Sequence, residues 1–180
     1  TDANDNSATK NFTVGDVLGL GSPTNFNLVL ESSAIPDDSP QVATVTNTAT
    51  KIIFGPAAVE TDVTLANDGD LTFLTAGKYY VQLLVNSGSV ETSTLTAVQS
   101  IYFNSYKNDV VYGSAIQDSL YLVINQMSTT EGLSINIIFD AAVSDVLSFK
   151  FSVSDLKMGL KHQASNLGSA RSANIKIYKI

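Results

Sequence analysis

The sequence predicts an all-β protein, a two-sheet antiparallel sandwich of about ten short strands with an extended N-terminal arm. Two observations carry this prediction. Apolar and aromatic residues recur with a period of two in short runs, and turn signals rich in Gly, Pro, Asn and Asp separate these runs. The sequence shows no heptads, no internal repeat and no helical pattern longer than about two turns. A chain of 180 residues suits one domain with a real core.

The first strand is predicted at Phe26–Glu31 and is ended by the turn cluster Ile35–Pro40. Gln41–Phe54 alternates apolar residues with Thr and Asn, which favours two short strands around Asn47. A further strand at Asp62–Ala66 precedes an Asn-Asp-Gly-Asp turn, and Asp-Gly between apolar runs is a strong hairpin signal.

Residues 71–86 organise the rest of the sheet pattern. Leu71–Leu74 and Tyr79–Val85 are apolar runs on either side of Thr75–Lys78, which we expect to be a tight turn. Gly77 tolerates the positive φ that such a turn needs. The nearly continuous apolar run after Lys78 indicates a strand covered on both faces, in the middle of a sandwich or at a subunit interface.

Later strands follow the same rules. Turns are expected at Ser87–Ser89 and at Tyr106–Asp109. The polar, glycine-bearing segment Asp155–Ser172 is expected to be a loop or a poorly paired excursion. The predicted strands after Ser89 are Ile101–Phe103, Val110–Tyr112, Leu120–Ile124, Leu133–Phe139, Val146–Val153 and Ala173–Ile180. Period-two alternation places Leu147, Phe149, Phe151 and Val153 inward, and Ile175 and Ile177 on one face.

Residues 1–25 are rich in Asp, Asn, Ser, Thr and Gly, so we divide the chain into an arm at 1–25 and a head domain at 26–180. Five apolar residues are candidates for anchoring the arm to a neighbour: Phe12, Val14, Val17, Leu18 and Leu20. The polar, acidic start predicts no signal peptide, and no apolar run approaches the ~20 residues of a spanning helix. We therefore expect no membrane partner.

The formal net charge of −7 argues against nucleic acid as a partner, because phosphate neutralisation needs a broad basic face. The charge is uneven: residues 1–70 hold ten acids and two lysines, whereas residues 150–180 hold six basic residues and one acid. The basic end could meet the acidic end of a neighbouring copy or another protein, or both could be scattered solvated charge. The absence of cysteine excludes disulfides, thiol nucleophiles and cysteine-ligated zinc.

Several motifs follow one another along the chain in a fixed order: Thr48–Phe54, Asp62, Gly69–Phe73 and Ala76–Tyr80. This order resembles the tumour-necrosis-factor and complement globular-head family, and Ser172–Ile180 is similar to the closing strand of that family. The similarity covers roughly residues 41–180. It implies a jelly-roll fold and a homotrimer in which aromatic and aliphatic faces of three copies meet on an axis.

The arm, with Ala8–Thr13, resembles segments of structural proteins of tailed bacteriophages, in which this jelly roll recurs in capsid decorations and fibre tips. This resemblance implies a structural protein on the virion surface that decorates or cements the capsid, with other virion proteins as partners. The alternative is a tail-fibre or spike tip that binds a host receptor or glycan. Tyr106 and Tyr112 are then the candidate receptor-face residues.

No catalytic, cofactor or metal site is predicted. His162, the single histidine, is expected to be exposed in a loop, because no Gly-x-Ser-x-Gly elbow accompanies it. Asp62, Asp68 and Asp70 could share a calcium ion with Asn67, but their spacing does not fit an EF-hand loop and turn chemistry explains them. The sequon at Asn11–Thr13 is expected to be coincidental.

Two further sets of residues have alternative interpretations. Tyr102, Tyr106, Tyr112 and Tyr121 could form a recognition surface, although we expect tyrosines in strands to fill the core and the trimer seam. Paired carboxylates from Asp109, Asp118, Glu131 and Asp140 could hydrolyse a polysaccharide, but sequence spacing does not establish the ~5–10 Å separation that this chemistry needs. We expect the protein not to be an enzyme.

Overall fold

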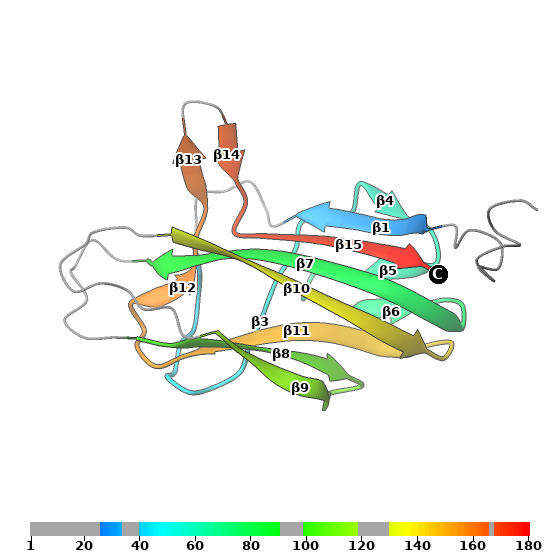
Figure 1. Ribbon diagram of the computed structural model, residues 1–180, viewed down its shortest axis with the longest axis horizontal. Helices are drawn as coiled ribbons and strands as arrows, with labels where there is room; N and C mark the ends of the chain where they lie inside the picture. The colour runs from blue at the N-terminus through cyan, green and yellow to red at the C-terminus, as the bar shows by residue number, and fades with distance from the viewer. Residues whose placement is uncertain (1–25, 34–39, 91–98, 119–129, 166–167) are drawn as a thin grey trace, which may run out of the picture.

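The structure, a computed structural model, describes residues 26–33, 40–90, 99–118, 130–165 and 168–180, and these residues form strands and connections without a helix. Two antiparallel sheets lie face to face (Figure 1). The predicted all-β sandwich is therefore confirmed. The arm at 1–25, most of the turn cluster at 35–40 and the predicted strand Leu120–Ile124 lie outside the described residues.

The first sheet has seven strands in the order β2-β12-β7-β15-β1-β4, and β10 pairs with the other side of β7. Its strands are β1 (Asn27–Ser33), β2 (Gln41–Val42), β4 (Val59–Glu60), β7 (Gly77–Ser89), β10 (Thr130–Ala141), β12 (Met158–Leu160) and β15 (Ala173–Lys179). β15 and β12 lie one after the other along one side of β7, because they pair with successive parts of it. β7 is thus the central strand of this sheet.

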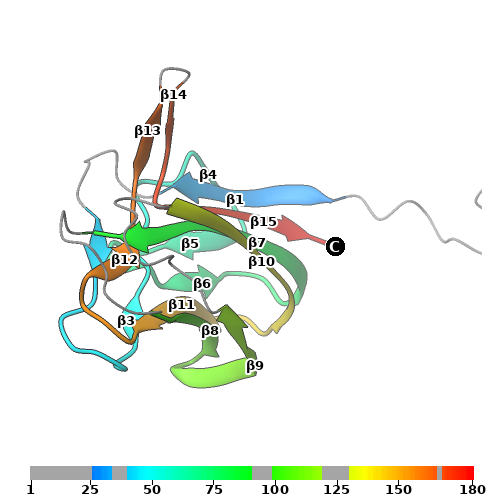
Figure 2. The ribbon, with the colours of Figure 1, turned by 60° about the vertical axis from the view of Figure 1, so that its left-hand side comes forward.

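The second sheet has six strands in the order β5-β6-β11-β8-β9, with β3 paired to part of β11. Its strands are β3 (Thr50–Lys51), β5 (Val63–Leu65), β6 (Leu71–Phe73), β8 (Ile101–Lys107), β9 (Val110–Asp118) and β11 (Val146–Val153). β13 (Gln163–Ser165) and β14 (Gly168–Ala170) pair only with each other and stand away from the sandwich (Figure 2).

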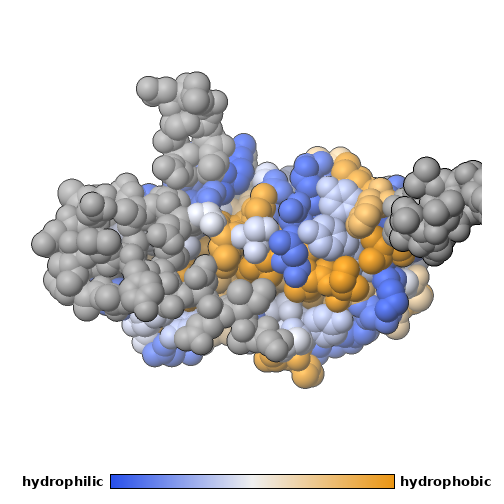
Figure 3. Space-filling model, viewed as in Figure 1, coloured by the Kyte–Doolittle hydropathy of each residue, from blue (hydrophilic) through white to orange (hydrophobic). Residues whose placement is uncertain are grey.

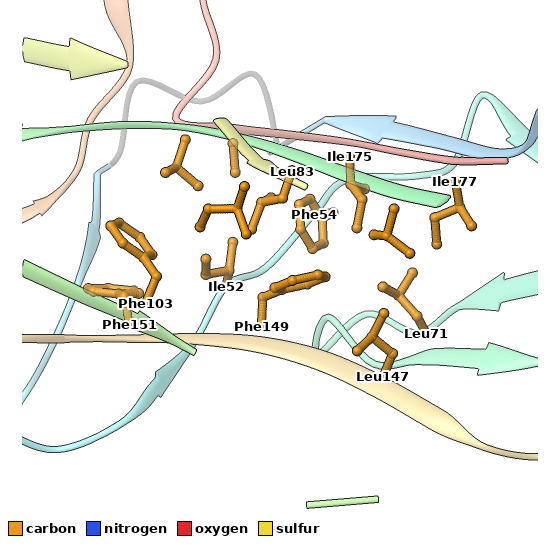
Figure 4. Close-up of a cluster of buried hydrophobic side chains, with 14 of the residues drawn as sticks. Ile52, Phe54, Leu71, Leu83, Phe103, Leu147, Phe149, Phe151, Ile175 and Ile177 are labelled. Carbon is orange, nitrogen blue, oxygen red and sulfur yellow. The ribbon is translucent and has the colours of Figure 1, made fainter. Parts of the chain in front are cut away.

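The core fills the space between the two sheets (Figure 4). The alternation predicted for β11 is confirmed, since Leu147, Phe149, Phe151 and Val153 are all buried. Ile175 and Ile177 on β15 are fully buried opposite them, also as predicted. β7 alternates in the same way, with its odd-numbered residues from Tyr79 to Val85 buried and its even-numbered residues facing outward. Each sheet therefore contributes one face to the core.

The predicted turns at Asn67–Asp70 and Tyr106–Asp109 are confirmed as hairpins. The first joins β5 to β6, and Gly69 there has a φ of 89°. The second joins β8 to β9 through Asn108 and Asp109, which have φ values of 50° and 63° and match the turn type that suits two-residue hairpins. The two short strands expected around Asn47 are β2 and β3.

The turn expected at Thr75–Lys78 does not pair the two apolar strands on either side of it. β6 and β7 belong to different sheets, so this connection crosses the sandwich. Phe73 and Tyr79 face each other across the core with ring centroids 4.7 Å apart, and the Tyr79 hydroxyl donates to the Thr75 carbonyl oxygen at 2.8 Å. Both apolar runs pack on the core, one from each sheet, so the two runs show the same apolar pattern in the sequence.

The turn predicted at Ser87–Ser89 was wrong, and so was the loop predicted as one alternative for Asp155–Ser172, although β13 and β14 fit the other alternative, a poorly paired excursion. β7 continues through Ser87–Ser89, because these residues pair with both β10 and β12. The segment Asp155–Ser172 contains β12, β13 and β14, and Met158 and Leu160 are fully buried. Among the described residues there is no helix long and apolar enough to cross a membrane.

Candidate functional site

The outward-facing side of the seven-stranded sheet, here called the outer face, carries apolar side chains that no other part of the described chain covers. Leu84 and Ile138 are 44% and 52% exposed, and Phe26, just before β1, is 60% exposed. Hydrophobic residues are visible over β7, β10 and β15 with polar ones between them (Figure 3). The subunit-interface interpretation of the apolar run after Lys78 fits this half-covered strand.

Strand pairing places the outward-facing side chains of β10, β7, β15 and β1 in rows that run across the sheet, and each row is here called a level. One level is mainly apolar and consists of Ile138, Tyr80, Tyr178 and Leu28. The next outward-facing level is polar and consists of Asn136, Gln82, Lys176 and Glu31, and the third contains Ser134, Leu84, Asn174 and Ser33. The apolar level lies at one end of the sheet, and the polar levels lead away from it.

Three rings form an aromatic cluster at the apolar level. Phe26 packs edge-on against Tyr80 and Tyr178 at centroid distances of 6.1 and 6.2 Å, and the two tyrosines are 6.2 Å apart. The Tyr80 hydroxyl donates to Asn136 Oδ1 at 2.8 Å. Such rings combine a large apolar area with few rotatable bonds, which is why aromatic residues are enriched at protein interfaces.

The polar part of the outer face is hollowed into a groove of about 630 Å³ near the base of the β13–β14 hairpin. Leu84, Asn174 and Arg171 line the groove together with the ion pair between Lys176 Nζ and Glu31 Oε1, which are 3.0 Å apart. Hydrogen bonding to Glu31 raises the pKa of Lys176 above its usual value. This surface therefore combines polar groups and charge with a few aliphatic side chains.

A second apolar surface, here called the β9–β10 edge, lies where the two sheets end on the same side. In the described part of the chain β9 pairs only with β8, and β10 only with β7. Val110, Val111 and Ile138 are all at least half exposed on this edge, and Figure 3 shows a hydrophobic patch at the lower rim near β9. Exposed edge strands tend to pair with or pack on another chain.

The β9–β10 edge also opens into a cavity of about 440 Å³ between the sheets. Its lining is mainly apolar and includes Phe103, Ile135 and Ile137, and Tyr112 lies beside them. The Tyr112 ring packs against Phe139 at a centroid distance of 5.0 Å and so joins β9 to β10.

The two candidate receptor-face tyrosines point in different directions. Tyr106 lies on the outward side of the six-stranded sheet, where Lys150 Nζ is 4.2 Å from its ring centroid. Tyr112 pairs with Ser105, the neighbour of Tyr106, so its side chain points to the other side of the sheet and packs on the core. The structure therefore does not bring the two onto one surface. Tyr121 lies outside the described residues.

The candidate calcium carboxylates are also separated. Lys51 Nζ is 2.9 Å from Asp68 Oδ2 and 2.6 Å from Asp70 Oδ1, and its hydrogen bond lowers the pKa of Asp68. Asp62 instead accepts from Lys179 Nζ at 3.1 Å. Within the described ranges, no three His, Cys, Asp or Glu side chains gather closely enough to hold a metal ion.

The residues considered for catalysis do not converge in the described chain. His162 lies in the short connection between β12 and β13 and is half-buried, not exposed as expected. Asp109 pairs with Lys150 at 3.2 Å and Asp140 with Lys78 at 3.5 Å, on different sheets. The side chains of Asp118 and Glu131 lie outside the described parts of the chain, as do the five arm candidates.

The acidic first half and the basic end of the chain meet within one molecule. Lys176 pairs with Glu31, and Lys179 pairs with Asp62, because β15 lies beside β1. From the sequence, the basic residues near the C-terminus could face another chain or the solvent. Two of them, Lys176 and Lys179, form ion pairs within the same molecule.

Sequence reasoning named none of the three residues of the aromatic cluster as site residues. Phe26, Tyr80 and Tyr178 come from three separate strand regions, and only the pairing of β7 with β15 and of β15 with β1 brings them together. One signal in the sequence could have pointed to the cluster. Tyr80 occupies an even-numbered, outward-facing position of β7, where a strand with one solvent-exposed face would carry a polar residue.

Comparison with known proteins supports the fold. No family model matches this sequence, and no curated protein matches it. Among solved structures, the globular domain of zebrafish complement 1qA protein is similar with a TM-score of 0.51 and 12% sequence identity, over 86% of this chain and 97% of that chain. At this identity the likeness concerns the fold alone. The chain has an antiparallel jelly-roll sandwich like that complement globular domain, and the predicted fold class is confirmed.

Proposed function

We propose that this chain is the head subunit of a homotrimeric, non-enzymatic surface protein. One observation carries the proposal: a single copy exposes two unlike apolar surfaces, the outer face with its aromatic cluster and the β9–β10 edge. When the edge of one copy packs on the face of the next, both surfaces are buried. Because the two surfaces differ, this contact is heterologous, and heterologous contacts that close by rotation form rings.

The distribution of the apolar residues favours a ring whose axis runs parallel to the strands. Lys107 Nζ, at the end of β8, donates to the Asp140 carbonyl oxygen at 2.9 Å, so Val110 and Val111 lie at the same end of the sandwich as Ile138. The aromatic cluster also lies at this end. Rotation about such an axis keeps the ends aligned and places apolar edge residues against aromatic face residues. A ring of three is what the family resemblance implies.

The finer proposal is that this trimer sits on a virion surface and decorates or cements a phage capsid through residues 1–25. It is supported by the similarity of the arm, with Ala8–Thr13, to segments of phage structural proteins. The arm candidates Phe12 to Leu20 would contact a capsid protein, since so polar a segment needs a neighbour to become ordered.

A tail-fibre or spike tip that binds a host receptor or glycan is the second candidate function. Tyr106 favours it, because its ring lies on the outward side of the six-stranded sheet, with Lys150 Nζ 4.2 Å from the ring centroid. A tyrosine ring beside a lysine offers an apolar platform together with a hydrogen-bond donor, which suits a sugar ring.

The trimer is tested by placing a charge on the proposed contact. Ile138→Glu puts a carboxylate on the β9–β10 edge, where it would be buried unpaired in the ring, so we expect the trimer to dissociate at micromolar concentration. Val45→Glu is the matched control, because Val45 is 56% exposed, close to the 52% of Ile138, and lies in the β2–β3 connection. Sedimentation equilibrium of the full chain measures both variants. A wild-type monomer, or equal behaviour of the two variants, contradicts the proposal.

A further inference from the structure

The groove on the outer face combines an excess of positive charge with neutral hydrogen-bonding groups. Its volume of about 630 Å³ lies within the ~300–1,000 Å³ typical of sites for small ligands. Of the described residues that line it, Arg171 and Lys176 are cationic and Glu31 is anionic. The groove is therefore locally positive in a chain whose formal net charge is −7, and such a local field favours an anionic ligand.

The uncompensated charge in the groove belongs to Arg171. Lys176 Nζ is 3.0 Å from Glu31 Oε1, so these two charges neutralise each other. Among the described residues, no carboxylate forms an ion pair with the Arg171 guanidinium. A guanidinium presents its N–H donors in a planar fork that matches the two oxygens of a carboxylate. The groove thus holds a cation suited to a carboxylate that the described chain does not supply.

Neutral polar side chains surround this cation. Asn86 on β7, Asn174 on β15 and Ser134 on β10 add amide and hydroxyl groups to the lining. Asn86 Nδ2 donates to the Arg171 carbonyl oxygen at 2.6 Å, which leaves Asn86 Oδ1 as an acceptor toward a ligand. Amides offer both donors and acceptors, and so do the hydroxyl groups of a sugar. Leu84, which is 44% exposed, adds aliphatic surface on which the C–H face of a sugar ring can pack.

An acidic peptide suits this groove less well than an acidic sugar. Peptides that bind to sheets commonly add a strand to a free edge, where backbone N–H and C=O groups are unpaired. In the groove, β7 pairs with β10 on one side and with β15 on the other, and β15 also pairs with β1. The backbone groups of β7 and β15 are therefore used within the sheet, and side chains make the contacts to a ligand on this face.

We propose that the groove binds a sugar residue that carries a carboxylate, with the carboxylate on the Arg171 guanidinium and the sugar hydroxyl groups on Asn86, Asn174 and Ser134. The groove lies within one copy, so the proposal does not depend on the homotrimer. It lies on the polar levels of the outer face, whereas the aromatic cluster proposed for the contact between copies lies at the apolar level. It is also distinct from the surface around Tyr106, which belongs to the other sheet.

A glycan array probed with the full-length chain tests the ligand class. The array pairs glycans that carry uronic or sialic acids with neutral glycans of the same backbone. We expect the chain to bind acidic members only, and to bind them less tightly as the salt concentration rises, because salt screens ionic contacts. The proposal is overturned if no acidic glycan binds, if the neutral counterparts bind equally well, or if a hexaglutamate peptide binds and the acidic glycans do not.

Three variants place the site, with the Kd of the tightest-binding glycan measured by isothermal titration calorimetry. Arg171→Gln removes the cation but keeps the carbonyl oxygen that Asn86 contacts, so it should weaken binding about 10- to 100-fold. Leu84→Trp keeps the charge but fills the groove, and should abolish binding.

Lys150→Gln is the matched control, because it removes one positive charge beside Tyr106 on the other sheet and should bind like the wild type. Circular dichroism melts show whether each variant folds. If Lys150→Gln loses binding, or if Arg171→Gln or Leu84→Trp retains it, the groove is overturned as the site. A wild type that is a monomer in sedimentation equilibrium would refute the proposed trimer and leave this test unchanged.

Discussion

Asp145 links the β8–β9 turn to the β10–β11 turn by hydrogen bonds and an ion pair. Its Oδ2 is 2.7 Å from Lys107 Nζ and accepts from the Ala142 backbone N–H at 2.6 Å, and its Oδ1 accepts from Asn108 Nδ2 at 2.9 Å. Asn108 in turn accepts from the Val146 N–H at 2.8 Å. These bonds, first of all the one from Lys107, lower the pKa of Asp145 from 3.8 to about 2. Its charge therefore stabilises the folded chain.

This network predicts a pH dependence with a definite sign. A carboxylate whose pKa is depressed on folding contributes its stabilisation above the unfolded pKa, and the contribution is lost as pH falls from about 5 to about 2. Asp145→Asn should lower the free energy of unfolding at pH 7 by about 1–2 kcal/mol and flatten its dependence on pH in that window. Urea denaturation at pH 7, 4 and 2.5 measures this. Asp140→Asn, at an exposed pair, should change little, and an unchanged acid slope in Asp145→Asn would contradict the prediction.

At the scale of elements, local patterns predicted the strands but not how distant strands meet. β11 and β15 were predictable because period two and burial agree residue by residue. The Thr75–Lys78 connection was not, since a short turn between two apolar runs suits a hairpin and a sheet crossing equally, and only pairing with β11 and β15 decides between them. β12 was missed because three residues are too few to show a period. The aromatic cluster depends on the same distant pairings.

The β5–β6 hairpin shows how strongly one turn position is constrained. Gly69 has a φ of 89°, and a Cβ there would collide with the Ile52 carbonyl oxygen. Gly69→Ala should therefore lower the free energy of unfolding by about 2–4 kcal/mol. Gly113 is the matched control: its φ is 77°, but a Cβ added there would meet no atom within 4 Å, so Gly113→Ala should cost only about 1 kcal/mol for the backbone conformation. Chemical denaturation compares them, and equal losses would mean that the collision is relieved.

For the whole molecule, the described core and the proposed contacts belong to the head alone. Every buried hydrophobic residue of the core lies between Val29 and Ile177, and the aromatic cluster begins at Phe26. The arm at 1–25 therefore precedes both the core and the aromatic cluster. We therefore propose that the head folds and assembles, and that the arm attaches it to a partner.

Deleting residues 1–25 should therefore leave a folded, trimeric head that no longer binds its particle. The matched control is Phe26→Ser in the same truncated chain. This variant removes one ring of the aromatic cluster and, unlike the truncation alone, should weaken the trimer, since Phe26 contacts both Tyr80 and Tyr178. Sedimentation equilibrium reports assembly, and co-sedimentation with particles stripped of this protein reports attachment. Retained particle binding by the truncated head would refute the arm as the anchor. Binding to host cells by the full-length trimer, with no binding to stripped capsids, would instead favour the fibre-tip function.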